Sequence, residues 1–389
     1  MTAHYPLHLH LSGRRVLVVG GGAVAARRVR SLLDAGARVD VVALETVDGF
    51  PDVPVARRPF VADDVEGAWL VHACTGVVDD EVATECERRG TWCARADDAE
   101  LSAAWVPAVA RVDDVVLSVT AGRDPRRAVA LRDALALHVE LGDVPLRRSR
   151  PGAGCVALVG GGPGDPGLLT VRARQLLAQA DVVLRDRLAP HVDVPDGVEV
   201  VEVGKDPAGR STPQRDIEAV MVERAQAGQR VVRLKGGDVH LFARGIEEVA
   251  ACVEAGVPVE VVPGVSSAFA VPACAGIPVT ARGVAQSVSV VSAHLPPGDP
   301  ASTVDWDALA RVGGTLVLLM AVGRLTEACE ALMAGGRAGT TPVAVVHDGT
   351  LPSQRTVTTT LAWAAHDAAD VPAPAVVVIG EVVAERVAT

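Results

Sequence analysis

The sequence predicts an α/β protein built from two parts, and three observations carry this prediction. Short strands rich in valine alternate with helical segments, each part opens with a strand and a glycine loop, and a stretch rich in Pro, Gly and Arg separates the parts. Strands that alternate with helices are typical of a parallel, doubly wound sheet. The length of 389 residues suits two or three domains, each with its own core.

The first part contains five predicted strands and three predicted helices. The strands are short apolar runs with many β-branched residues, which favour extended backbone. They cover Arg15–Gly20, Arg38–Ala43, Trp69–Thr75, Thr91–Ala96 and Val115–Thr120. Between or after them, segments of helical character cover Val24–Ala35, Glu81–Arg89 and Arg126–Leu141.

The stretch Gly142–Gly154 is the expected linker, because it combines Pro, Gly and Arg without an apolar period. We assign residues 1–143 to the first domain, 144–153 to the linker and 154–389 to the second domain, with lobes of about 154–265 and 266–389. The second domain has helical stretches at Pro213–Ala227 and Ile246–Ala255. Its predicted strands are Cys155–Gly160, Val182–Leu184, Val231–Leu234, Val259–Val262, Val288–Ser292, Thr315–Met320, Val343–Val346 and Ala375–Ile379.

Composition and charge exclude several classes of function. The formal net charge of −11 argues against nucleic acid and acidic membranes as partners, because both are polyanions. No apolar run reaches the roughly 18 residues of a membrane span, and the N-terminus lacks the pattern of a signal peptide. The seven cysteines contain no Cys-x-x-Cys, which suits free thiols in a reducing cytoplasm. No metal-ligand set is predicted, so the metal ligands stay unknown.

Lysine is nearly absent from the chain. Of 37 basic residues, only Lys205 and Lys235 are lysines. A compact ammonium and a planar guanidinium are not interchangeable, so these two lysines are candidates for specific roles.

The first glycine loop, Gly20-Gly21-Gly22-Ala23-Val24-Ala25, follows a strand and opens a helix. This order matches the dinucleotide fingerprint G-x-G-x-x-[GA], in which glycines let the backbone approach a pyrophosphate at the helix N-terminus. Ala43 and Leu44, at the end of the second strand, complete the predicted dinucleotide contacts. Of the two nearby acids, Glu45 has a better position than Asp40 to bind a ribose, which favours NAD over NADP.

The N-terminal segment resembles a known enzyme family. The segment YPLHLHLSGRRVLVVGGGAVAARRVRSLLDAGARVDVVA resembles the start of precorrin-2 dehydrogenase, and the resemblance continues through Cys93–Val109. In that family an aspartate serves both hydride transfer and metal chelation. The resemblance implies this role for Asp97, ten positions before Pro107. Asp98 is adjacent, and a solvated Asp-Asp turn is the alternative interpretation.

The second glycine loop, in Val156–Thr170, differs from a dinucleotide loop because Pro163, Asp165 and Pro166 interrupt the expected helix start. The motifs after it are VVLRDRL, VGKDPAG, VVRLKGGDVHLFARG, VVPGVSSAFAVPACAGIPVTARG and QSVSVVSAH. Together they resemble uroporphyrinogen-III C-methyltransferase over residues 153–389. The whole chain therefore resembles the siroheme synthases, which implies a Rossmann-like dinucleotide domain followed by a two-lobed tetrapyrrole methylase domain.

The resemblance also implies cofactors and site residues. S-adenosylmethionine would be bound by Pro163, Gly236, Gly237, Asp238, Leu241, Ser266, Ser267, Met320 and Ala344. Asp186 matches the base that removes a proton after methyl addition, and Lys205 matches its partner acid or carboxylate clamp. The tetrapyrrole substrate carries eight carboxylates, for which Arg185, Arg187, Arg210 and Arg244 are candidate partners.

The function implied is double methylation of uroporphyrinogen III, then oxidation by NAD⁺, then insertion of Fe²⁺ as a chelation substrate. Two alternatives remain: a methyltransferase whose first domain binds NAD without catalysing, and a plain two-domain dehydrogenase, against which the interrupted loop and the Gly-Gly-Asp motif count. Iron or cobalt, and siroheme or cobalamin, stay open. Most of a helical segment that supports dimers in this family is missing here. We therefore expect a homodimer through the methyltransferase domain.

Overall fold

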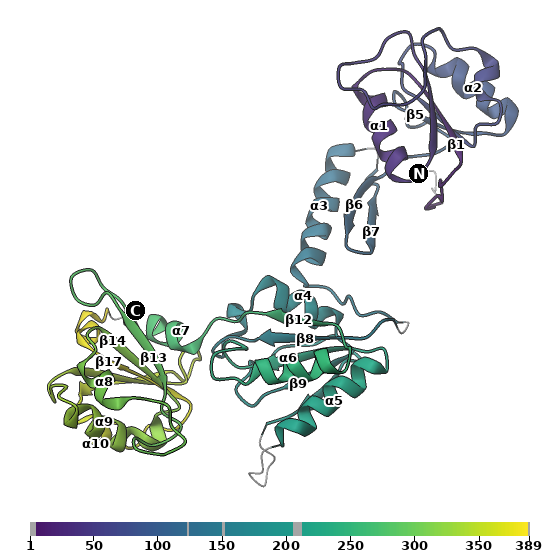
Figure 1. Cartoon of the computed structure of the whole chain (residues 1–389). Helices are drawn as coiled ribbons and strands as arrows, with labels where there is room; N and C mark the ends of the chain where they lie inside the picture. Colours follow the sequence, from purple (N-terminus) through teal and green to yellow (C-terminus); the bar gives the residue numbers. More distant parts are fainter. Residues whose placement is uncertain (1–4, 123, 150–151, 205–211, 388–389) are drawn as a thin grey trace. The chain divides into compact units, whose positions relative to one another are not determined.

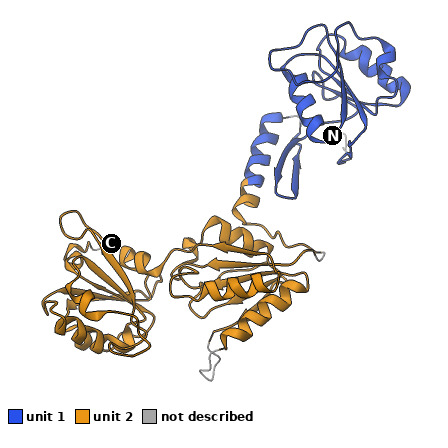
Figure 2. Cartoon of the chain, in the orientation of Figure 1, with its two compact units in different colours: residues 1–136 blue, residues 137–389 orange. Residues whose placement is uncertain are grey.

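The computed structural model describes residues 5–122, 124–149, 152–204 and 212–387 (Figure 1). The chain forms two compact units, Met1–Ala136 and Leu137–Thr389 (Figure 2), and each is described by itself. Within the described ranges, no helix combines the length and the apolar character that a membrane span requires.

The first unit is built on a parallel sheet of five strands in the order β3-β2-β1-β4-β5. Alternate residues of the central strand face opposite sides: Val16 and Val18 pack in the same apolar cluster as α1, whereas Leu17 and Val19 pack with α2. The predicted doubly wound parallel sheet is therefore confirmed. Its elements are β1 (Arg15–Val19), α1 (Ala23–Asp34), β2 (Arg38–Val42), β3 (Val55–Ala56), β4 (Leu70–Ala73), α2 (Asp79–Arg89) and β5 (Trp92–Arg95).

The fifth predicted strand exists but does not belong to this sheet. β7 (Val115–Val119) pairs antiparallel with β6 (Ala108–Val112) in a separate two-stranded sheet. Only Asp113 and Asp114 connect the paired ends, and Asp113 has a φ of 50°. A two-residue connection can join only antiparallel strands. The prediction missed β6, so it placed this strand in the parallel sheet.

Helix α3 (Pro125–Leu141) follows the hairpin, and the division between the two units falls within it. Asp124 caps the helix, because its Oδ1 accepts a hydrogen bond from the amide of Arg127 at 3.0 Å. A carboxylate at the start of a helix stabilises it, because it accepts from a free backbone amide and faces the positive end of the helix dipole.

The first lobe of the second unit contains a five-stranded parallel sheet in the order β10-β9-β11-β8-β12. β8 lies between β11 and β12, and apolar clusters cover both faces of this sheet. The elements are β8 (Cys155–Gly160), α4 (Val171–Gln179), β9 (Val182–Arg185), β10 (Glu199–Glu202), α5 (Gln214–Gln226), β11 (Arg230–Lys235), α6 (Gly245–Glu254) and β12 (Val259–Val262).

The second lobe has a mixed sheet in the order β13-β14-β17-β15-β16. β13 and β14 are parallel, whereas β17 runs antiparallel to both β14 and β15, and β15 and β16 form an antiparallel pair. The elements are α7 (Ser267–Cys274), β13 (Val288–Ser292), α8 (Trp306–Arg311), β14 (Thr315–Leu319), α9 (Leu325–Ala334), β15 (Pro342–His347), β16 (Arg355–Thr360), α10 (Ala364–Asp367) and β17 (Ala375–Ile379).

The start of the expected linker packs on the second unit. The amide of Leu146 donates to the carbonyl of Ala178 at 2.9 Å, and the Arg147 Nε lies 2.9 Å from Oδ1 of Asp181. Residues 146 and 147 are therefore held by the first lobe.

Candidate functional site

The first glycine loop lies where β1 ends and α1 begins. Gly20 has a φ of 123°, and a side chain on Gly20 or Gly21 would collide with the carbonyl of Cys74 or of Glu45. Gly22 differs, because its backbone is extended and an added Cβ would have no atom within 4 Å. As the N-cap of α1, Gly22 supplies no side chain to the first turn. The loop therefore leaves an open helix N-terminus, which is the geometry that binds an anion.

The end of β2 lies beside this loop. Ala43 is buried and Leu44 is exposed, and the carbonyl of Glu45 faces Gly21. Asp40 lies inside β2, where the Nε of Arg15 donates to its Oδ2 at 2.7 Å. Of these two acids, Glu45 has its backbone beside the glycine loop, whereas Asp40 already has a partner.

Asp97 follows β5 and forms an ion pair with Arg95. The guanidinium donates from Nε to Oδ1 at 2.9 Å and from Nη2 to Oδ2 at 2.7 Å, and it also contacts Asp80 at 2.5 Å. The hydrogen bonds from Arg95 lower the pKa of Asp97 to about 2. Asp98 accepts instead from the amide of Glu100 at 2.8 Å. Asp98 therefore forms the turn, and Asp97 is the carboxylate held by a cation.

A pocket of about 940 Å³ lies in the second unit and takes its walls from both lobes. Its charged lining residues are Asp186, Arg187, Asp238 and Asp348, accompanied by His191. Nine of the predicted site residues line it: Pro163, Asp186, Gly236, Gly237, Asp238, Leu241, Ser266, Ser267 and Met320. The structure thus brings together residues that are up to 157 positions apart in the sequence.

Of the described residues predicted to bind S-adenosylmethionine, Ala344 is not among those that line the pocket. Ala344 is fully buried in β15 and packs in an apolar cluster with Ala268 and Val271, whereas Val346 of the same strand does line the pocket. Lys205 lies outside the described residues, as does Arg210.

Three glycine backbones meet at one wall of the pocket. A Cβ on Gly264 would collide with the carbonyl of Gly237 and lie 2.6 Å from the Cα of Gly160. Gly237 also has a φ of 66°, a conformation that favours glycine. The Gly-Gly-Asp motif is therefore required for a close approach of strand ends, with Gly237 shaping the wall.

Asp238 fixes the loop after β11. Its Oδ1 accepts from the amide of His240 at 2.9 Å and its Oδ2 from the amide of Gly264 at 3.1 Å. Ser266 caps α7 by accepting from the amide of Ala268 at 3.2 Å. Both side chains therefore have local structural partners as well as a place at the pocket.

Strained backbone is concentrated at this pocket. Phe242, Met320 and Asp348 have φ values of 54°, 59° and 46°, and all three line it. Positive φ is unfavourable for residues with a side chain and clusters at functional sites. Phe242 and Asp348 were not predicted, because nothing in the local sequence marks a positive φ at residues of these types.

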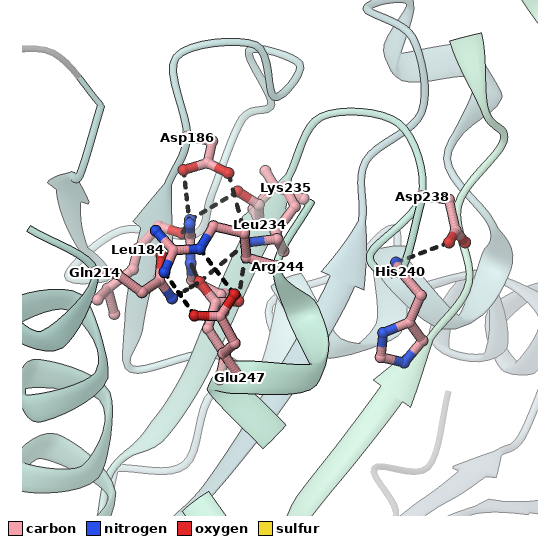
Figure 3. Close-up of polar contacts among 11 residues, drawn as sticks. Leu184, Asp186, Gln214, Leu234, Lys235, Asp238, His240, Arg244 and Glu247 are labelled. Carbon is pink, nitrogen blue, oxygen red and sulfur yellow. Dashed lines mark hydrogen bonds and ion pairs between the residues drawn. The ribbon is translucent and has the colours of Figure 1, made fainter. Parts of the chain in front are cut away.

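Asp186 lies directly after β9 and belongs to a group of polar contacts (Figure 3). Its side chain is partly exposed and lines the pocket. Its Oδ1 accepts from Nη2 of Arg233 at 2.6 Å, and its Oδ2 lies 3.8 Å from Nζ of Lys235. Asp186 is therefore connected to charged groups beneath the surface, of which the sequence had singled out only Lys235.

Two of the arginines proposed as carboxylate partners already have protein partners. Arg185 donates from Nε to Glu202 at 2.9 Å, and Arg244 donates to Glu247 at 2.6 Å and 2.9 Å. Arg187 lines the pocket. Of the three described candidates, Arg187 is the one placed to meet a substrate carboxylate there. Among the described residues, no group of three or more His, Cys, Asp or Glu side chains is arranged to hold a metal ion.

Comparison with known proteins finds a different family match in each of two separate parts of the chain. Residues 156–365 match the family model described as tetrapyrrole (corrin/porphyrin) methylases, and residues 7–108 match a putative NAD(P)-binding family. A siroheme synthase of Chromobacterium violaceum is 37% identical, over 97% of this chain and 95% of the relative. That alignment spans 453 residues, more than the 389 of this chain, so the relative carries residues that this chain lacks.

Solved structures resemble the second unit. The native uroporphyrin III C-methyl transferase of Thermus thermophilus is 40% identical, with a TM-score of 0.51, over 60% of this chain and 100% of its own length. The form of that enzyme complexed with S-adenyl homocysteine is also 40% identical, with a TM-score of 0.50, over 59% of this chain and 93% of its own.

Proposed function

The chain belongs to the siroheme synthase family, and from this premise we propose that it is a multifunctional tetrapyrrole enzyme. It methylates uroporphyrinogen III twice with S-adenosylmethionine, oxidises the product with NAD⁺ to sirohydrochlorin, and inserts Fe²⁺ as the substrate of chelation. The observation that carries the proposal is the pocket in which Asp186 and the Gly236-Gly237-Asp238 motif come together. The alternative of a methyltransferase with a non-catalytic first domain is less favoured.

The pocket has the chemistry that S-adenosylmethionine needs. This donor is a sulfonium cation, and the pocket presents three carboxylates, Asp186, Asp238 and Asp348, together with backbone groups of Gly236 and Gly237. When bound, it supplies an electrophilic methyl group. Proposed binding residues are Pro163, Gly236, Gly237, Asp238, Leu241, Ser266, Ser267 and Met320, with Ala344 as support behind the wall.

In the methylation step, an electron-rich carbon of the tetrapyrrole forms the new carbon–carbon bond while the bond from the methyl carbon to the sulfonium sulfur breaks. The sulfur leaves as a neutral thioether, so the protein need not supply a nucleophile. Asp186 then accepts the proton that leaves a neighbouring carbon, and its place at the pocket surface allows this role. Arg187 is available for a propionate or acetate of the substrate. Lys205 remains the proposed partner of Asp186 from the family resemblance.

In the first unit, the open N-terminus of α1 at Gly22, Ala23 and Val24 fits a pyrophosphate. Ala43 and Leu44 stand beside the loop, and Glu45 would repel the 2′-phosphate of NADP. Bound NAD⁺ supplies a hydride acceptor. Asp97 is the proposed base of oxidation and ligand in chelation. Both steps are expected to be slower than methylation, because Asp124 places a negative charge near a substrate with eight carboxylates.

We propose residues 1–143 as the dehydrogenase and chelatase domain, 144–153 as linker and 154–389 as the methyltransferase domain. A cytoplasmic location is supported by the seven cysteines, which are all described and form no disulfide. A homodimer through the methyltransferase domain completes the proposal, since homodimers are the commonest oligomers.

One incubation separates the activities. Purified protein with S-adenosylmethionine and uroporphyrinogen III should give precorrin-2 by absorbance, NAD⁺ should then give sirohydrochlorin, and Fe²⁺ should give siroheme. Asp97→Ala should stop oxidation without affecting methylation, and Asp124→Ser should make oxidation faster. Methylation with no oxidation at any NAD⁺ concentration would instead support the methyltransferase-only alternative.

A further inference from the structure

A cluster of buried charges lies beneath Asp186. Arg233 and Lys235 of β11 and Glu248 of α6 have relative exposures of 1%, 2% and 0%. The carboxylate of Glu248 accepts from Nε of Arg233 at 2.9 Å and from Nζ of Lys235 at 3.0 Å and 2.9 Å. Gln214 donates to the same carboxylate at 3.3 Å. Figure 3 shows Asp186, Lys235 and Gln214 converging on these contacts.

The backbone explains why these side chains meet. Arg233 and Lys235 are two positions apart on β11, so they project from the same face of the sheet. Gly245, Glu248 and Cys252 form the buried stripe of α6, which places the acid of that stripe against the same face. Asp186 joins from the end of β9, the strand paired with β11.

Among the described residues of this cluster, Asp186 is the one that lines the pocket. Its side chain is 31% exposed, whereas those of Arg233, Lys235 and Glu248 are at most 3% exposed, and none of these three lines the pocket. Two cations and two carboxylates balance when all four are ionised. A buried ion pair contributes little net stability compared with apolar packing, so the arrangement is better explained by an effect on Asp186.

We propose that Arg233, Lys235 and Glu248 are positioning residues for methyl transfer, which orient the Asp186 carboxylate and place a buried cation at each of its oxygens. Arg233 bridges Asp186 and Glu248 and thereby fixes one oxygen of the base. Glu248 keeps both cations in place, and Lys235 faces the second oxygen of Asp186. The proposal rests on the proposed methyltransferase function.

Within the part of the chain that the structure describes, the charged groups of the strands and helix beside Asp186 either pair with one another or line the pocket. On the neighbouring strands, Arg185 pairs with Glu202, and at the start of α6, Arg244 pairs with Glu247. Arg187, His191, Asp238 and Asp348 line the pocket with Asp186. Burial and the nearby Arg233 lower the pKa of Lys235, and Glu248 opposes that shift. The charge of Lys235 therefore depends on Glu248.

The test measures kcat of methylation as a function of pH in the full chain, for variants that change the number of charges in the cluster. Lys235→Met leaves one uncompensated negative charge, so the acid limb of kcat should move up by about 1 pH unit or more. Adding Glu248→Gln restores the balance between Arg233 and Asp186, so the double variant should return the limb toward wild type. Its kcat should stay at least tenfold below wild type, because Arg233 has lost the group that fixes it.

Glu254→Gln is the matched control, because Glu254 lies on the same helix α6 but is exposed, and its profile should equal wild type. S-adenosylmethionine affinity should change less than threefold in every variant. An acid limb in Lys235→Met that matches wild type, or a double variant with full kcat, would overturn the proposal. If Lys235→Met does not fold, the double variant alone decides by its kcat. Absence of methylation in the wild type would instead contradict the proposed function itself.

Discussion

Asp186 and Asp97 are both carboxylates proposed to act on a tetrapyrrole, yet they are held in different ways. Asp97 binds Arg95 through both oxygens near the protein surface. Asp186 uses one oxygen for a buried guanidinium and leaves part of its side chain at the pocket. Both oxygens of Asp97 are therefore held by one cation, whereas one oxygen of Asp186 faces a buried guanidinium and part of its side chain stays at the pocket.

Asp186→Asn should lower kcat of methylation by about 100-fold or more, since an amide cannot take up the proton. S-adenosylmethionine affinity should stay within a few-fold, because Asp186 is proposed to act after methyl addition. Single-turnover assays and calorimetric titration measure the two quantities. An Asn variant as active as wild type would show that another group is the base.

The ion pair of Asp97 should make the stability of the folded protein depend on pH in the acid range. Its pKa is about 2 in the folded protein and about 3.9 when unfolded, so the unfolded chain binds more protons near pH 3. The stabilisation is complete above pH 4 to 5 and is lost as the pH falls toward 2.

Melting curves of wild type and Asp97→Asn check this prediction. Their difference in Tm should be constant from pH 5 to 7 and shrink between pH 4 and 2. Asp98→Asn is the control, because its amide oxygen can still accept the backbone hydrogen bond from Glu100. A difference for Asp97→Asn that does not change with pH would contradict the ion pair.

At the scale of elements, substitutions at two glycines of the loop between β1 and α1 should affect folding and dinucleotide binding differently. Gly22→Val should abolish dinucleotide binding, because the side chain would occupy the open space at the start of α1. Methylation should remain unchanged and Tm should fall only slightly, since the backbone of Gly22 is extended but valine is a poorer N-cap residue than glycine. Fluorescence titration with NAD⁺ and thermal melting measure the two effects.

Gly21→Ala is the informative contrast, because its Cβ would collide with the carbonyl of Glu45. That variant should lose stability as well as binding. Normal NAD⁺ affinity in Gly22→Val would mean that the pyrophosphate lies elsewhere.

The elements that could be predicted from sequence are those with a strong apolar signal. β1, β8 and β17 are nearly continuous apolar runs, and each was predicted within one residue of its bounds. β16 (Arg355–Thr360) consists of Arg, Thr and one Val and was missed, because it is not an apolar run. Its β-branched residues do favour extended backbone, and its pairing with β15 places it at the edge of the sheet.

The same limit applies to the site. The Gly-Gly-Asp motif and Asp186 carry local patterns, so their residues could be named from the sequence. Glu248 could not, since an acid on an amphipathic helix normally faces water, and only the fold shows it at 0% exposure. The rarity of lysine did mark Lys235, but a residue count does not reveal a partner 13 positions away.

At the scale of the whole molecule, the two units should be separable. A fragment of residues 137–389 should methylate with the kcat of the full chain, because every residue lining the pocket belongs to that unit. A fragment that starts at Gly152 should keep this activity with a lower Tm, since it lacks the contacts of Leu146 and Arg147.

Sedimentation of the same fragments tests the proposed dimer. Residues 137–389 should sediment as a dimer, and residues 1–150 as a monomer. A stable dimer of the 1–150 fragment would place the association in the first unit, where α3 exposes Val129, Leu131 and Leu135.

The order β10-β9-β11-β8-β12 has a consequence for synthesis on the ribosome. β8 is the first strand of its sheet to be made, yet both neighbours come later, starting at Arg230 and Val259. Until then, the apolar run Cys155–Gly160 has two unpaired edges, a state that promotes aggregation of nascent chains. Translation that stops before Val262 should therefore yield insoluble product, and full-length yield should depend on chaperones that shield β8.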